Sequence, residues 1–236
     1  MADTLQSQGV HERDDETQPL LGRHEDPTTD STGQHTPLPY LQFLILCYLR
    51  ILDPLNFTQI LPYVNELVLY LGVTDDPKQV ATYSGMVEGV FLCCQLVAFY
   101  PWGWLSDNVG RRPVILAGTL GLSVATVFFG FSKSFVSVLA ARAVSGLFSG
   151  NIAVLPTAVI KVTNDSNQET IMSVFGIWWP LGAIIGPLIG GTFANPTKRF
   201  PGLFGNNTLF RNYPYLLPCL FAAGMNCIGL IPAVQT

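Results

Sequence analysis

Charged side chains are scarce in this chain of 236 residues, of which only 12% are Asp, Glu, Lys or Arg. Soluble domains carry about 25% charged residues, and 49% of this chain is hydrophobic, so its composition excludes an ordinary water-soluble domain. The sequence also has no basic tract, so nothing in it indicates a nucleic-acid partner. The remaining class is a protein whose main partner is the lipid bilayer.

Metal-binding and catalytic patterns are missing as well. All three histidines lie in the first 38 residues, outside the apolar part of the chain. The five cysteines are odd in number and show no metal-type spacing, so we interpret them as small core residues. The sequence shows no nucleophile–base constellation and no phosphate-binding loop at a membrane face. We therefore expect no metal site and no bound cofactor, and a membrane enzyme is the least favoured class.

Residues 1–38 form a polar segment without Phe, Trp or Tyr. Such a segment buries too little apolar surface to offset its ordering entropy, so a disordered cytoplasmic tail is predicted. It also lacks the apolar stretch of a signal peptide. Within it, Glu16, Leu20 and Leu21 have the spacing of an acidic dileucine sorting signal, which favours the vacuolar membrane over the plasma membrane.

Residues 39–236 alternate apolar runs with polar loops. A helix needs about 20 apolar residues to cross the hydrocarbon core of a bilayer. The first run is too long for one straight span, so it is expected to tilt or to extend into the interface. The runs predict an all-α membrane protein with six transmembrane helices, at about 40–71, 81–102, 113–132, 135–160, 170–194 and 213–234.

The first run contains Arg50 and Asp53, which lie three residues apart and so share one helical face. One interpretation is a pair that neutralises itself near the cytoplasmic end of the helix. The other places Asp53 in a polar cavity, where Pro54 loosens the helix beside it. We favour the second interpretation, because charged residues inside membrane spans mark functional sites.

Two later spans carry one deeply placed charge each, Glu88 and Arg142. Glu88 has no opposite charge near it in sequence, so it must face protein or water, as a proton carrier does. The alternative is a neutral, hydrogen-bonded acid in the core. Arg142 lies about two turns inside its span, too deep to reach water easily. It needs an acidic partner or a water-filled cavity.

The loop between the second and third spans reads WGWLSDNVGRRP at 102–113. Its charges are Asp107, Arg111 and Arg112, and Gly103 and Gly110 leave room for close backbone approach. The spacing resembles the signature loop between the second and third helices of Major Facilitator Superfamily transporters. Two basic residues that are common in that loop are replaced here by Trp104 and Asn108.

Glycines recur every four residues in two spans, and stripes of small residues let membrane helices pack closely. In the fourth span, Gly146 and Gly150 follow Arg142, and the pattern resembles a second motif of the same superfamily that is linked to proton transfer. The fifth span resembles the motif of the superfamily's antiporters. That motif consists here of Gly182, Gly186, Pro187, Gly190 and Gly191.

Further segments resemble one branch of the superfamily, the zinc-induced facilitator-like members of the drug:proton antiporters, which include fungal vacuolar proteins. These segments are RILDP at 50–54, YSGMVE at 83–88, GNIAV at 150–154 and YPYLLP at 213–218. The resemblance implies the N-terminal six-helix half of the superfamily fold. It also implies export of a small organic molecule, with the proton as coupling ion, by rocking of two halves around a midplane site.

The resemblance assigns roles to the residues that match its motifs. Asp53 and Glu88 would take up and release protons, and Arg142 would pair with them when they are ionised. Asp107, Arg111 and Arg112 would latch the cytoplasmic gate, and the glycines of the fifth span would seal and bend it. Family members have a second six-helix half, which this chain lacks. A non-transporting module or regulator, or a half-transporter active only as a homodimer, is therefore the alternative.

Overall fold

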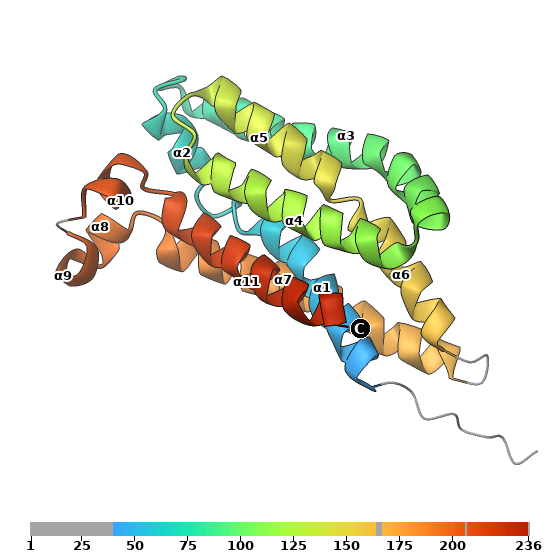
Figure 1. Ribbon diagram of the computed structural model, residues 1–236. Coiled ribbons are helices and arrows are strands. Elements are labelled where there is room, and N and C mark those ends of the chain that lie inside the picture. The colour runs from blue at the N-terminus through green and yellow to red at the C-terminus, as the bar shows by residue number, and fades with distance from the viewer. Residues whose placement is uncertain (1–39, 164–166, 206, 236) are drawn as a thin grey trace, which may run out of the picture. The chain divides into compact units, whose positions relative to one another are not determined.

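Long helices form the part of the chain that a computed structural model describes, residues 40–163, 167–205 and 207–235 (Figure 1). Within these ranges every regular element is a helix, which confirms the predicted all-α class. The helices are α1 (Tyr40–Thr58), α2 (Val64–Tyr70), α3 (Pro77–Val109), α4 (Arg111–Gly130), α5 (Phe135–Phe148), α6 (Asn151–Val162), α7 (Gln168–Phe193), α8 (Pro196–Arg199), α9 (Pro201–Phe204), α10 (Thr208–Asn212) and α11 (Leu216–Gln235).

Four helical segments in the described ranges are long and apolar enough to cross a bilayer, and Leu216–Ile231 is a shorter apolar helix. α1 falls outside this set because it carries Arg50, Asp53 and Asn56 within its apolar sequence. The four long segments are Pro77–Val109, Arg111–Gly130, Phe135–Lys161 and Gln168–Phe193.

The run predicted at 40–71 is not one tilted span, because residues 59–63 form turns between α1 and α2. Pro62 has no N–H to donate to the carbonyl of Thr58. That carbonyl instead accepts from Leu61 at 3.1 Å, which tightens the chain into a turn. A second, smaller interruption at Ser149 and Gly150 divides the run predicted at 135–160 into α5 and α6.

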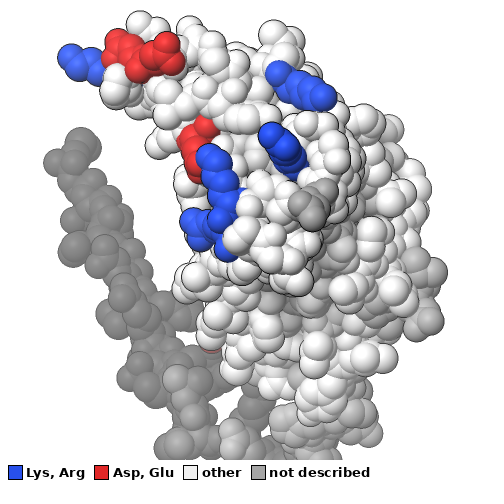
Figure 2. Space-filling view, turned by 90° about the vertical axis from the view of Figure 1, so that its left-hand side faces the viewer, with Lys and Arg blue, Asp and Glu red and all other residues white. Residues whose placement is uncertain are grey.

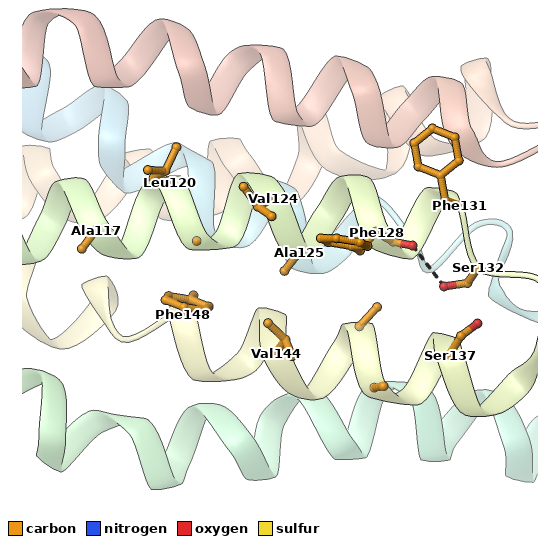
Figure 3. A pocket seen from close by; sticks show the side chains of 13 residues that line it. Ala117, Leu120, Val124, Ala125, Phe128, Phe131, Ser132, Ser137, Val144 and Phe148 are labelled. Carbon is orange, nitrogen blue, oxygen red and sulfur yellow. Dashed lines mark hydrogen bonds between the residues drawn. The ribbon is translucent and has the colours of Figure 1, made fainter.

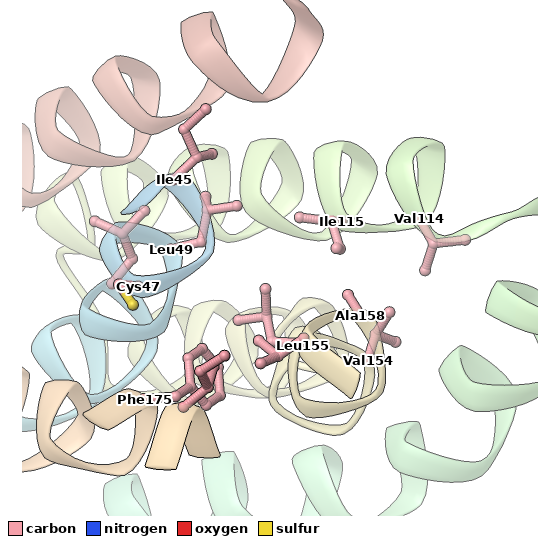
Figure 4. Packing of buried hydrophobic residues seen from close by; sticks show 12 residues of the cluster. Ile45, Cys47, Leu49, Val114, Ile115, Val154, Leu155, Ala158 and Phe175 are labelled. Carbon is pink, nitrogen blue, oxygen red and sulfur yellow. The ribbon is translucent and has the colours of Figure 1, made fainter. Parts of the chain in front are cut away.

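α1 lies inside the bundle, where it packs against α7, α11 and α6 (Figure 1). α4 lies between α11 and α5, and α5 in turn packs against α3. Figure 4 shows Leu49, Ile115, Leu155 and Phe175, from α1, α4, α6 and α7, pointing toward one another in a buried apolar cluster. This cluster joins the first span to the spans that follow it.

Charged side chains gather at the end of the bundle formed by α2 and α8–α10 (Figure 2). Both signs are present there, with Glu66 in α2, Lys198 and Arg199 in α8, and Arg211 in α10. Large apolar side chains lie exposed along the long helices instead, such as Leu96 and Tyr100 of α3. This separation fits helices whose sides face lipid and whose ends face water.

A buried polar network joins α1, α4 and α11. The Asn56 amide donates to Asn226 Oδ1 at 2.9 Å and to the Leu52 carbonyl at 2.7 Å. The Thr126 hydroxyl donates to Asn56 Oδ1 at 3.2 Å. Asn56 and Asn226 are fully buried, so each amide depends on these partners.

We predict that Asn226→Leu lowers the free energy of unfolding by about 2 kcal/mol, because it removes the two hydrogen bonds that the buried Asn56 and Asn226 amides exchange. Thermal unfolding of the purified chain in detergent measures the change. The matched control is Asn108→Leu, since Asn108 is exposed and bonds within its own helix. Its effect should stay within about 0.5 kcal/mol. Equal effects of the two variants would contradict the prediction.

Candidate functional site

Glu88 of α3, which is partly buried, and Arg142 of α5, which is fully buried, form an ion pair. An Arg142 terminal nitrogen donates to Glu88 Oε2 at 2.6 Å, and the Arg142 side chain is 2% exposed. The guanidinium carbon also lies 4.5 Å from the ring centroid of Phe91 and 5.8 Å from that of Phe57. Of the two expectations for Arg142, the structure shows the acidic partner. That partner is Glu88, whose own partner could not be found near it in sequence.

Asp53 of α1 carries the second carboxyl, which is buried. Its Oδ1 accepts a hydrogen bond from the Ser149 hydroxyl at 2.6 Å, and Ser149 Oγ accepts from Gln95 at 2.8 Å. Asp53 Oδ2 has no hydrogen-bond partner within the described part of the chain. The carboxyl lines a cavity of about 80 Å³, whose other walls include Phe57, Gln95 and Trp179.

The self-neutralising pair of Arg50 and Asp53 is not formed. The one ion pair among the described residues is that of Glu88 and Arg142. Arg50 instead lies over the ring of Phe175, at 5.3 Å from its centroid. The structure places Asp53 in the wall of a cavity that Pro54 also lines, but this cavity is mostly apolar and not the polar one that the second interpretation expects.

Two aromatic rings lie between the carboxyls. Phe57 and Phe91 stack at 5.3 Å between centroids. Phe91 contacts the Arg142 guanidinium on one side and lines the Asp53 cavity on the other. Each carboxylate has one oxygen that no described residue bonds, Asp53 Oδ2 and Glu88 Oε1. The arrangement can hold or release a proton at two separate positions within one bundle.

Sequence reasoning missed the polar side chains that hold Asp53. Neither Ser149 nor Gln95 belongs to the motifs or charged positions selected from the sequence. The available signal was their position, because both are polar residues inside runs that are otherwise apolar. Their convergence on Asp53 comes from three different helical segments, which sequence spacing does not show.

The loop between α3 and α4 is a turn of one residue, Gly110, with φ of 104°. Only glycine adopts this conformation without strain. Arg111 donates to the carbonyl of Thr157 in α6, so the loop is tied to the fourth span. Arg111 and Arg112 also line a pocket of about 230 Å³ with Lys161. Asp107 forms no ion pair with any described residue.

The expectation that Gly103 allows close backbone approach is wrong for the described part of the chain. A Cβ placed on Gly103 would meet no atom within 4 Å. Its neighbour Trp102 makes the close contact instead, donating from its indole nitrogen to the Leu147 carbonyl at 2.6 Å. The latch role of the loop stays a prediction.

The glycines of the fifth span face α1. A Cβ on Gly182 would overlap the Ile51 carbonyl oxygen, and one on Gly190 would overlap that of Gln59. A Cβ on Gly186 would overlap the Thr58 hydroxyl. Gly191 makes only ordinary contact with a proline, and Pro187 lies inside α7. The stripe therefore lets α7 lie directly against the backbone of the helix that carries Asp53.

The glycines of the fourth span face α3. A Cβ on Gly146 would overlap the carbonyl oxygen of Phe91, and one on Gly150 would overlap the ring of Trp102. This close approach brings α5 near enough to α3 for Arg142 to reach Glu88. The stripe thus positions the ion pair, although the helix is interrupted at Gly150 itself.

A larger groove of about 750 Å³ lies between α4 and α5 (Figure 3). Its walls are apolar, with Val124, Phe128 and Val144 among them, and its polar members are two serines near one end. No charged side chain lines it. The groove therefore offers no group for proton exchange and is separate from the Asp53 cavity.

Two further predictions concern the sorting signal and metal binding. The sorting signal of Glu16, Leu20 and Leu21 lies outside the described residues. Among the described residues, no group of three or more His, Cys, Asp or Glu side chains is placed to hold a metal ion.

Comparison with known proteins finds the superfamily that the sequence motifs resemble. The family model described as Major Facilitator Superfamily matches residues 60–210. A multidrug transporter of this superfamily from Aspergillus fumigatus, mfsB, is 38% identical over 194 residues, covering 82% of this chain and 32% of the relative. The Arabidopsis thaliana protein ZINC INDUCED FACILITATOR 1 is 29% identical over 181 residues, covering 77% of this chain and 37% of the relative. The chain thus spans about a third of the length of these relatives.

A solved structure shows the same fold. The human organic anion transporter MFSD10 superposes with a TM-score of 0.64 at 22% identity, over 83% of this chain and 47% of that one. This likeness confirms an all-α membrane fold that corresponds to one half of such a transporter. Together with the family match over most of the chain, it leads to one conclusion: the chain belongs to the Major Facilitator Superfamily.

Proposed function

We propose that the chain carries the proton-coupling half of an antiporter that moves a small organic molecule across a membrane by alternating access. The observation that supports this most directly is the presence of two carboxyls, the buried Asp53 and the partly buried Glu88, inside a bundle of apolar helices. Burying a charged side chain among apolar helices costs free energy, so such residues mark functional sites. Membership of the Major Facilitator Superfamily indicates that the process is membrane transport.

Proton exchange at Glu88 changes its attraction to Arg142. An ionised Glu88 holds the guanidinium at 2.6 Å, and a protonated Glu88 keeps only a neutral hydrogen bond. Because Arg142 is fully buried, weakening this pair changes which arrangement of α3 and α5 is favoured. Proton binding is thereby linked to helix packing, as alternating access requires.

Asp53 is proposed as the second exchange site and as part of the substrate cavity. Asp53 lines the cavity together with Trp179 and Phe57, which offer apolar surface to an organic molecule. The Asp107, Arg111 and Arg112 loop is proposed as the cytoplasmic latch. The vacuolar membrane is proposed as the location, from the dileucine spacing in the tail.

We predict that Glu88→Gln reduces proton flux at least tenfold, because the amide cannot exchange a proton. The chain is reconstituted in vesicles loaded with the pH dye pyranine, and a panel of small organic amines and acids is added under an imposed pH gradient. The matched control is Glu66→Gln, since Glu66 lies exposed in α2. It should behave as the wild type. Full proton-driven flux in Glu88→Gln would remove Glu88 from the mechanism.

The alternative function is a six-helix module that works only with a second half, supplied by another chain or by a second copy. The observation that favours it is the chain's coverage of only 32% of its fungal relative. Vesicles that contain single chains, counted by stepwise photobleaching, separate the proposals. Flux from single-copy vesicles contradicts the module, whereas flux only from vesicles with two copies supports it.

A further inference from the structure

Gln59 is a fully buried side chain whose two polar atoms have no described partner. It lies in the turn after α1 and is 0% exposed, and neither its Oε1 nor its Nε2 is hydrogen-bonded to a described residue. Its backbone is held in place, since its N–H bonds to the Leu55 carbonyl at 3.0 Å and its own carbonyl abuts Gly190. The Gln59 side-chain amide therefore needs a hydrogen-bond partner other than the described residues.

The Gln59 side chain lines a small cavity of about 10 Å³ together with Arg142 and Ser145. The Arg142 Nε–H is likewise buried without a described hydrogen-bond partner. A cavity of about 10–15 Å³ holds one water molecule when it offers two to four polar partners. The size and the polar lining of this cavity both meet that requirement.

Only those lining groups that can still form a hydrogen bond are able to bind a water molecule in this cavity. The Asn56 amide is already engaged by Asn226 and Thr126, so it contributes little. The Ser145 hydroxyl donates to the Ala141 carbonyl at 2.8 Å, which leaves its oxygen free to accept. The groups left are the Arg142 Nε–H and the Gln59 Nε2 amide as donors, with Gln59 Oε1 and Ser145 Oγ as acceptors.

We infer that this cavity binds one water molecule, which accepts a hydrogen bond from Arg142 Nε and donates to Gln59 and Ser145. Three hydrogen bonds are the usual number for a buried water. The water holds the guanidinium through Nε, while a terminal nitrogen bonds Glu88, so Gln59 is a positioning residue for Arg142. Its role in coupling rests on the proposed function, whereas the binding site itself does not.

Radiolytic hydroxyl-radical footprinting of the full chain in lipid nanodiscs tests the site, because radicals formed from a bound water oxidise the side chains next to it. Phe129 lines the cavity and is 3% exposed, so its oxidation reports the water. Phe175 is equally buried, at 2%, in an apolar cluster away from the cavity. We expect at least a fivefold higher oxidation rate at Phe129 than at Phe175. Equal rates would overturn the inference.

Gln59→Met provides a second test, because a hydrated cavity and a dry cavity predict changes in Tm of opposite sign. If the water is present, the variant loses its hydrogen bonds and leaves Arg142 Nε unpaired, so the Tm falls by about 3 °C, as expected for about 1 kcal/mol in a chain of this size. If the cavity were dry, the variant would remove two unpaired polar atoms and raise the Tm. A rise or an unchanged Tm therefore contradicts the inference.

The matched control for Gln59→Met is Gln95→Met in α3. Gln95 bonds directly to Ser149 at 2.8 Å and does not line the water cavity. The Gln59→Met variant should lose the oxidation of Phe129, and Gln95→Met should retain it. Loss of this signal in both variants would show that it does not depend specifically on Gln59 and would overturn the inference. A wild-type chain that moves no protons but oxidises Phe129 would contradict the proposed function alone.

Discussion

Gly190→Ala is expected to lower the free energy of unfolding by about 3 kcal/mol or more, at the high end of overpacking effects. The added Cβ would overlap the carbonyl oxygen of Gln59 and lie 2.8 Å from its carbonyl carbon. Both are backbone atoms, so no side chain can rotate to make room. The only relief is to move α7 away from α1 as a whole, which separates many contacts between these helices. Thermal unfolding of the purified chain in detergent measures the loss.

Neighbouring glycines of the same helix provide a graded control series. Gly186→Ala should cost less, because part of its overlap is with the Thr58 side chain. Gly191→Ala should be nearly neutral, since its Cβ would lie 3.6 Å from Pro62. Gly176→Ala meets no atom within 4 Å and should be neutral or stabilising, because alanine is the better helix former. A series without this order would contradict the proposed packing.

The glycine spacing of the fifth span shows how far sequence reasoning reaches. A repeat of four residues in an apolar run predicts a helix with one small face, and the structure has that helix in α7. The spacing does not say which helix meets this face, because that depends on the packing of the whole bundle. The contact with the α1 backbone is a property of the tertiary structure alone.

The charged residues show the same limit. Their depth inside apolar runs predicted that Asp53, Glu88 and Arg142 need partners. The partners themselves are separated from them by 54 residues for Arg142 and Glu88, and by 96 for Asp53 and Ser149. No local pattern encodes such distances.

The interruptions within the predicted spans could be foreseen only in part. Pro62 signals a break, because proline removes a helix hydrogen bond. The interruption at Ser149 and Gly150 depends on Trp102 of another helix, which lies against the Gly150 backbone. Gly103, predicted to allow close packing, packs against nothing in the described chain. Spacing alone does not distinguish these two glycines.

Arg142→Met is expected to lower the free energy of unfolding by about 3 kcal/mol, the low end for a broken buried pair, because it leaves the partly buried Glu88 without its cation. Methionine keeps much of the volume of the arginine stem, so the change reports the charge more than the packing. The matched control is Arg112→Met, since Arg112 is exposed in the first turn of α4. Its effect should stay within about 0.5 kcal/mol. Chemical unfolding of each variant in detergent measures both.

The double variant Glu88→Leu with Arg142→Met tests whether the ion pair serves stability or proton coupling. Replacing a buried ion pair with apolar residues of similar volume is often neutral or stabilising, so the double variant should recover most of the stability lost in Arg142→Met. Strictly additive losses would show that the two side chains do not interact, contrary to their 2.6 Å contact. If the double variant folds as stably as the wild type and yet moves no protons, stability cannot explain the pair. The charges would then be needed for coupling, since an apolar pair serves the fold equally well.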